Sequence, residues 1–81
     1  LSHKETPETW LSRTQDRMLL TQTLDALPAT YREVIVLKDL EDMSYKEIAQ
    51  VIGTPLGTVM SRLARGREML RTRLLASEWT T

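Results

Sequence analysis

Apolar residues recur at helical spacing along most of this chain, and polar residues divide them into four amphipathic segments. In the first segment Leu20, Leu24 and Leu27 fall at i, i+4 and i+7, which predicts a helix over about residues 14–26. No segment shows a comparably strong alternation of apolar and polar residues, which would indicate a strand. The pattern therefore favours an all-α fold.

The second segment begins at Pro28, which cannot donate a backbone hydrogen bond inside a helix but suits the first turn of one. We expect this helix to run over about residues 28–40 and to end in the acidic stretch that follows. Its broad apolar side contains Tyr31, Val34, Ile35 and Leu37.

The third segment is short and has a defined start and stop. Ser44 and Glu47 have the spacing of a capping box, in which each side chain accepts from the other residue's backbone N–H. Gly53 stands where a helix needs a left-handed residue to end. These signals predict a helix over residues 45–52, with Ile48, Ala49 and Ile52 buried.

The fourth segment is the longest. Thr54 is the expected N-cap, Pro55 the expected first helical residue, and the helix is expected to run to about Leu75. On a helical wheel the apolar positions gather on one side, and we expect the core face to comprise Leu56, Val59, Leu63, Gly66, Leu70 and Leu74. The predicted outward stripe comprises Thr58, Ser61, Arg62, Arg65, Met69 and Thr72.

The third and fourth helices, joined by a tight glycine turn, have the arrangement of a helix-turn-helix unit. We expect Ala49 and Gly53 to permit a close crossing of the two helices and Val59 to fill the angle between them. A plain helical hairpin in a bundle is the alternative. The expected fold is all-α: a four-helix domain over residues 14–77 with a C-terminal helix-turn-helix, of a winged-helix-like type. We expect residues 1–13 to form a linker or flexible N-terminus, with Trp10 and Leu11 able to dock on the domain.

Charge is distributed unevenly, although the formal net charge is zero. Residues 1–43 carry five Lys/Arg against eight Asp/Glu, and residues 55–81 carry five Arg against two Glu, so the front is at −3 and the back at +3. The C-terminal third is therefore the expected partner for an anion. A solvated charged face is the plainer reading of the same excess.

The outward stripe of the fourth helix has the chemistry that reads DNA. Arg can donate two hydrogen bonds to guanine O6 and N7, and Ser or Thr can bond several bases, when such a helix enters the major groove. Pro55 and Gly57 leave the helix start uncluttered, so that its backbone N–H groups can approach a phosphate. Arg67, Arg71 and Arg73 lie off the stripe or farther along, where they suit phosphates or acidic side chains.

The stretch LPATYREVIVLKDLEDMSYKEIAQVIGTPLGTVMSRLARGREMLR resembles region 4 of bacterial sigma factors, especially the extracytoplasmic-function (ECF) group. The resemblance runs from about Asp25 to Leu75. It implies recognition of the −35 promoter element in double-stranded DNA, docking on the β flap of RNA polymerase, and in many such factors occlusion by an anti-sigma protein. Pro28 and Arg32 match the family's opening of the second helix.

The resemblance also implies site residues. Thr58, Ser61, Arg62 and Arg65 match the DNA-contacting positions, and Ser44, Tyr45 and Lys46 match the start of the supporting helix, near the DNA backbone. The expected DNA-binding set is Ser44, Tyr45, Lys46, Pro55, Gly57, Thr58, Met60, Ser61, Arg62, Arg65 and Arg67. Two positions depart from the family, which often has Arg where Met60 stands and His or Phe where Ala64 stands.

Two other functions fit the pattern less well. The output domain of a response regulator has a similar four-helix plan but usually follows GTV with Lys and a segment that contains His. A pure protein-interaction module, held by an anti-sigma factor, would use the apolar and acidic second helix.

We expect no enzyme, metal site or cofactor, because His3 lies in the polar linker, Ser61 has no His neighbour, and the chain has no cysteine. No apolar run reaches the length needed to cross a bilayer, and a cytoplasmic location is expected. The first residue is Leu, which suggests a fragment of a longer protein.

Overall fold

The computed structural model describes the backbone of residues 17–79 and the side-chain surroundings of residues 17–76. The elements in chain order are α2 (Arg17–Ala26), α3 (Ala29–Ile35), the π-helix η1 (Val36–Leu40), α4 (Tyr45–Ile52) and α5 (Leu56–Trp79). No strand occurs between residues 17 and 79, so the all-α fold is confirmed without a β wing in that range. The positions of Trp10, Leu11 and His3 lie outside the described residues, and the boundary at residue 13 stays a prediction.

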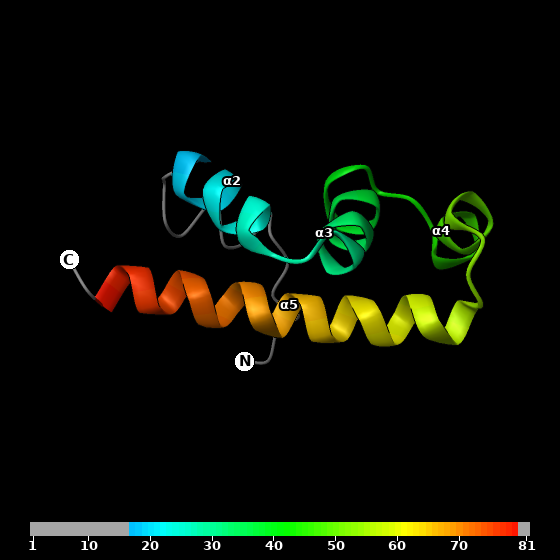
Figure 1. The fold of residues 1–81 in the computed structure, drawn as a ribbon. Coiled ribbons are helices and arrows are strands. Elements are labelled where there is room, and N and C mark those ends of the chain that lie inside the picture. The colour runs from blue at the N-terminus through cyan, green and yellow to red at the C-terminus, as the bar shows by residue number, and fades with distance from the viewer. Residues whose placement is uncertain (1–16, 80–81) are drawn as a thin grey trace, which may run out of the picture.

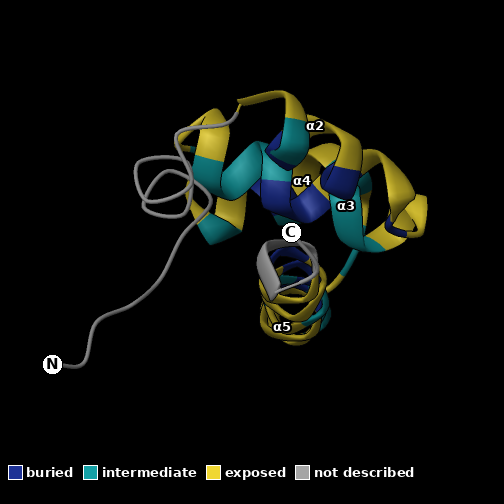
Figure 2. Ribbon diagram, turned by 90° about the vertical axis from the view of Figure 1, so that its left-hand side faces the viewer, coloured by how far each residue is buried: buried dark blue, intermediate teal, exposed yellow. Residues whose placement is uncertain are grey.

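The helices are arranged along α5, which is the longest element (Figure 1). α4 lies beside the N-terminal part of α5, α3 beside its middle and α2 beside its C-terminal half. Seen along α5, the buried residues face the other three helices and the opposite side is exposed (Figure 2). One long helix therefore supplies a wall of the core for three short ones and leaves an outer face uncovered.

The core follows the predicted apolar faces closely. Its buried hydrophobic residues are Leu20, Leu24, Leu27, Val34, Ile35, Ile48, Val59, Leu63, Leu70 and Leu74. The prediction for Leu56 was wrong, because its side chain is 42 % exposed. Leu56 is the first residue of α5, at the end of the helix where the chain has just left the turn.

Gly66 allows α3 and α5 to approach closely. A Cβ atom at this position would lie 3.1 Å from Ile35 Cδ1 and 3.2 Å from Tyr31 Cβ. These distances are shorter than ordinary van der Waals contact between carbons. The glycine in the middle of α5 is therefore explained by its contact with α3.

The second predicted helix consists of two parts. Pro28 is the N-cap rather than the first helical residue, because its carbonyl accepts from the backbone N–H groups of Tyr31 and Arg32, both at 3.0 Å. From Val36 the turns widen into the π-helix, and the N–H of Glu41 bonds to the Val36 carbonyl at 2.9 Å. The residue pattern gave no sign of this change, since π-helical turns have no distinct period of apolar positions at this length.

Arg32 joins α3 to α2. Its Nη1 atom donates to the backbone carbonyls of Asp25 at 3.2 Å and Leu27 at 3.3 Å. Carbonyls at the end of a helix lack intrahelical partners, so a guanidinium group there satisfies them and also complements the helix dipole. Arg32 thus has a structural role at the α2–α3 corner.

Candidate nucleic-acid interface

The helix-turn-helix begins at the capping box of α4, which the structure confirms. The Ser44 Oγ accepts from the Glu47 backbone N–H at 3.1 Å, and the Ser44 N–H donates to Glu47 Oε1 at 2.8 Å. Of the three residues predicted to face the DNA backbone here, Ser44 and Lys46 are exposed and Tyr45 is half-buried against the core. The Lys38 ammonium lies 4.7 Å from the centre of the Tyr45 ring, a cation–π contact.

Gly53 makes the bend between α4 and α5 through its backbone. Its φ is 67°, and the N–H groups of Gly53 and Thr54 both bond to the Ala49 carbonyl, which closes the end of α4. The predicted close crossing at Gly53 was wrong, because a Cβ at this position would have no neighbour within 4 Å. The glycine is needed for its left-handed conformation.

The start of α5 differs by one residue from the prediction. Leu56 is its first residue, and the Pro55 carbonyl accepts from the N–H groups of Thr58 at 3.0 Å and Val59 at 3.1 Å. The predicted cap by Thr54 was wrong, since its hydroxyl donates to the Ile52 carbonyl at 3.4 Å and Pro55 takes the capping position. Pro55 and Gly57 are both exposed, as an approach of phosphate to this end requires.

At its other end α5 continues past the predicted Leu75 to Trp79. No glycine or proline follows Leu75 to stop the helix. At 1.5 Å per residue the whole helix is about 36 Å long.

The outer face of α5 is rotated relative to the predicted stripe. Thr58, Arg62 and Met69 are half-buried, and Met69 packs against the core. The helical wheel predicted that these three residues would face solvent, because a wheel considers one helix alone and not the helices that flank α5 on that side. The exposed residues of its first turns are Leu56, Gly57, Met60, Ser61, Ala64, Arg65 and Glu68.

The outer face presents both donor and acceptor groups. The Ser61 hydroxyl donates to the Thr58 carbonyl at 3.2 Å, so its oxygen lone pairs remain available as acceptors. Among the described side chains no acidic group forms an ion pair with Arg62 or Arg65. No described acidic side chain therefore competes with a ligand for these two guanidinium groups.

Arg67 has a different surrounding from the other predicted DNA contacts. Its Nε donates to Asp39 Oδ2 at 2.9 Å and its Nη2 to Asp39 Oδ1 at 2.5 Å. The Asp39 side chain is only 4 % exposed and the Arg67 side chain 25 % exposed. The hydrogen bond to Asp39 raises the pKa of Arg67 although burial acts in the opposite direction. Arg67 thus ties α5 to the π-helix.

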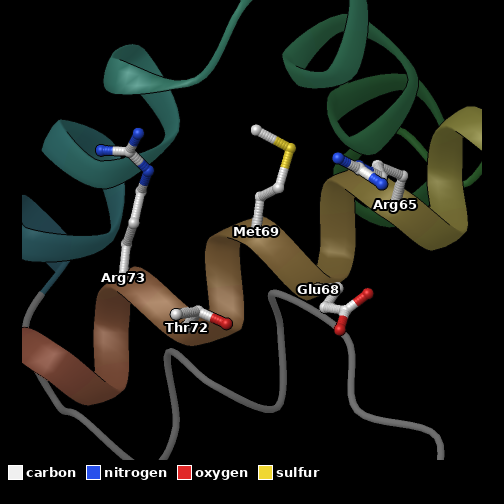
Figure 3. A pocket seen from close by; sticks show the side chains of 5 residues that line it. All are labelled: Arg65, Glu68, Met69, Thr72 and Arg73. Atoms are coloured by element: carbon white, nitrogen blue, oxygen red, sulfur yellow. The ribbon is translucent and has the colours of Figure 1, made fainter.

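An open groove runs along the flank of α5 next to the outer face. Its lining residues are Arg65, Glu68, Met69, Thr72 and Arg73. Figure 3 shows Arg65, Met69 and Arg73 projecting from one side of α5. Arg65 therefore borders both the groove and the outer face.

The described residues contain no group of three or more His, Asp or Glu side chains that could hold a metal ion. None of the helices between residues 17 and 79 is long and apolar enough to cross a membrane. Asp39, in the acidic part of the chain, accepts two hydrogen bonds from Arg67.

Comparison with known protein families decides between the candidate classes. The family described as "Sigma-70, region 4" matches residues 17–70, which include α2, α3, α4, the turn that joins α4 to α5 and the first fifteen residues of α5. The chain belongs to the sigma-70 region 4 family. This assignment favours the sigma domain over the response-regulator output domain.

Individual relatives carry the names of ECF sigma factors. The chain is 50 % identical over 52 residues to the ECF RNA polymerase sigma factor SigE of Mycolicibacterium smegmatis, which covers 64 % of this chain and 20 % of that protein. It is 34 % identical to an ECF RNA polymerase sigma-E factor of Haemophilus influenzae, over 86 % of this chain and 37 % of the relative. For the corresponding factor of Escherichia coli the identity is 38 %, over 79 % and 34 %. The chain thus spans between a fifth and two fifths of the length of these relatives.

Sequence reasoning missed two structural residues in this part of the molecule. No partner was predicted for Asp39, whose side chain is buried against an arginine 28 positions away. Arg32 was noted only for its match to the family, whereas it caps α2. The role of Asp39 depends on an opposite charge in a distant segment, and no local pattern in the sequence indicates which distant charge it will meet.

Proposed function

We propose that this domain recognises the −35 element of promoter DNA as part of a bacterial sigma factor that directs RNA polymerase to start transcription. The observation that supports this most directly is the outer face of α5, where Ser61 and Arg65 are exposed on a helix held by a helix-turn-helix bend. In units of this shape the second helix enters the major groove with its N-terminal residues at the base edges.

In this proposal the predicted residues have three roles. Ser61 and Arg65 contact base edges directly, and the half-buried Thr58 and Arg62 reach the DNA from the flank of α5. Exposed Lys46, with Ser44 and the start of α5, contacts phosphates. Arg67 holds the π-helix through Asp39, so its role is to fix the position of α5.

Protein partners are part of the same proposal. The end of the π-helix and the turn after it expose Leu40, at 48 %, beside the exposed acids Glu41 and Asp42. An apolar side chain among acids suits a protein surface and repels phosphate. We assign this turn to contacts with RNA polymerase, whose β flap is the expected docking point, or with an anti-sigma protein. The activity is binding without catalysis, in the cytoplasm, where the polymerase acts.

The proposal is tested by selecting bound sequences from random duplex DNA, with the full factor joined to core polymerase, and then measuring variants by fluorescence anisotropy. Arg65→Ala is expected to weaken binding to the selected site by about 1–3 kcal/mol if the guanidinium bonds a base. A scrambled duplex is the control. An equal loss on scrambled DNA would make Arg65 a phosphate contact, and the absence of any selected sequence would overturn the proposal.

A further inference from the structure

The outer face of α5 contains an apolar strip beside its polar residues. Gly57, Met60 and Ala64 are all exposed, and their spacings of three and four residues place them side by side on the helix. The Met60 side chain is 49 % exposed and does not contribute to the core cluster. We call Gly57, Met60 and Ala64 the apolar strip.

The strip occupies the middle of the face proposed to enter DNA. Ser61 and Arg65 border it on one side, and both are exposed. The next exposed residue on this face is Glu68, whose negative charge phosphate would repel, so the DNA-facing part ends near residue 65. From residue 57 to residue 65 the helix rises about 12 Å, which is similar to the width of the major groove.

One group in the major groove matches such a strip. The C5-methyl of thymine is the apolar feature that base pairs present there, and the other groups are hydrogen-bond donors or acceptors. Met is flexible and polarisable and adapts to irregular apolar contacts, whereas Gly57 and Ala64 are small enough to let the backbone come close. The Ser61 hydroxyl, with its proton held by the Thr58 carbonyl, presents an acceptor beside the strip, which suits the N6 amino group of an adenine.

We propose that Met60 and Ala64 contact the C5-methyl of a thymine in the recognised element and thereby select thymine at that position. The inference rests on the proposed function, because it requires α5 in the major groove. It concerns this chain's own residues, since the family often has Arg and an aromatic ring or His at these two positions. A polar side chain at position 60 would bond a base or phosphate, whereas Met60 gains only from an apolar surface.

The test replaces each thymine of the selected duplex, one at a time, with deoxyuridine, which lacks only the methyl group. Binding of the full chain is measured by competition anisotropy at fixed salt. We expect one thymine, or two adjacent ones, at which the uracil duplex binds about fourfold more weakly, as the burial of a single methyl predicts. Uracil at the remaining positions should have no effect.

Variants assign the effect to the strip. Met60→Gln keeps the length and helix propensity of the side chain but is polar, and it should bind the thymine and uracil duplexes equally at the sensitive position. Leu75→Gln is the matched control, because Leu75 is a 36 % exposed apolar residue near the far end of the same helix and should leave the fourfold ratio intact. Circular dichroism of both variants checks that the helices are retained.

The outcomes separate the two proposals. If the chain selects no DNA sequence, the proposed function fails. If it selects a sequence that contains no thymine, or one in which uracil is neutral at every position, the methyl contact is overturned while the proposed function stands. An unchanged ratio in Met60→Gln would also overturn it.

Discussion

The Asp39 carboxylate is buried and is paired with one arginine, Arg67. Two hydrogen bonds from Arg67 satisfy it, in the bidentate geometry that makes such pairs strong and directional. The pair connects residues 28 positions apart, in the π-helix and the middle of α5. Replacing one member leaves the other charge partly buried without its partner, which costs more than the intact pair contributes.

Asp39→Asn is expected to lower the free energy of unfolding by about 2–3 kcal/mol, because the amide can bond Arg67 but cannot neutralise it. Urea unfolding followed by circular dichroism measures the change. Asp42→Asn is the matched control: Asp42 is exposed with a φ of 59°, which Asn tolerates, so a change within about 0.5 kcal/mol is expected. Equal effects of the two substitutions would show that the buried pair contributes nothing.

Between α4 and α5 the direction of the chain depends on one residue. Gly53 adopts a φ of 67°, after which Pro55 caps the start of α5. Space is not the constraint, because a Cβ at Gly53 or at Gly57 would meet no atom within 4 Å. The two glycines differ in conformation, since Gly57 is helical. This difference allows the backbone effect to be isolated.

Gly53→Ala should destabilise the domain by about 1 kcal/mol, because an L-residue is strained in the left-handed region. Gly57→Ala, the matched control, should be neutral or stabilise by up to about 1 kcal/mol, because Ala favours a helix over Gly. Thermal unfolding of the two variants at equal concentration gives the comparison. If both substitutions shift the midpoint in the same direction and by the same amount, the conformational explanation fails.

Across the whole molecule, the charges of the two ends oppose each other. The acidic front and the turn at Glu41 and Asp42 repel phosphate, whereas the cations available to DNA are concentrated at α4 and the first turns of α5. Arg67 is paired with Asp39, which reduces further the number of cations that can contact phosphates. A small set of phosphate contacts is therefore expected, together with weak binding by the isolated domain.

We expect the logarithm of the DNA-binding constant to fall with the logarithm of salt concentration with a slope of about −2 to −4, as for two to four neutralised phosphates. Anisotropy across a salt series gives the slope. Lys46→Ala should make it shallower by about 1, because this lysine is proposed to contact a phosphate. Arg17→Ala, at the exposed first residue of α2, should leave the slope unchanged. A binding constant insensitive to salt would contradict the assignment.

Much of the architecture could be predicted because its signals are local. The bounds of α4 match the prediction at both ends, since a capping box and a left-handed glycine each act within a few residues. The ten buried core residues were also on the expected faces, because helical periodicity reports them directly. Identification of the family depends on the same stretch, and the contacts to DNA stay predictions.

By itself, the sequence determined where the α-helices lie, the turn between α4 and α5, and which side chains could form a core, but not the π-helix at Val36–Leu40. Only the tertiary structure decided which part of α5 faces outward: it turned Met69 toward the core, exposed Leu56, and joined Arg67 to Asp39. The physical reason is that exposure and ion pairing depend on which distant helices cover each turn of α5. Periodicity along one helix carries no information about that.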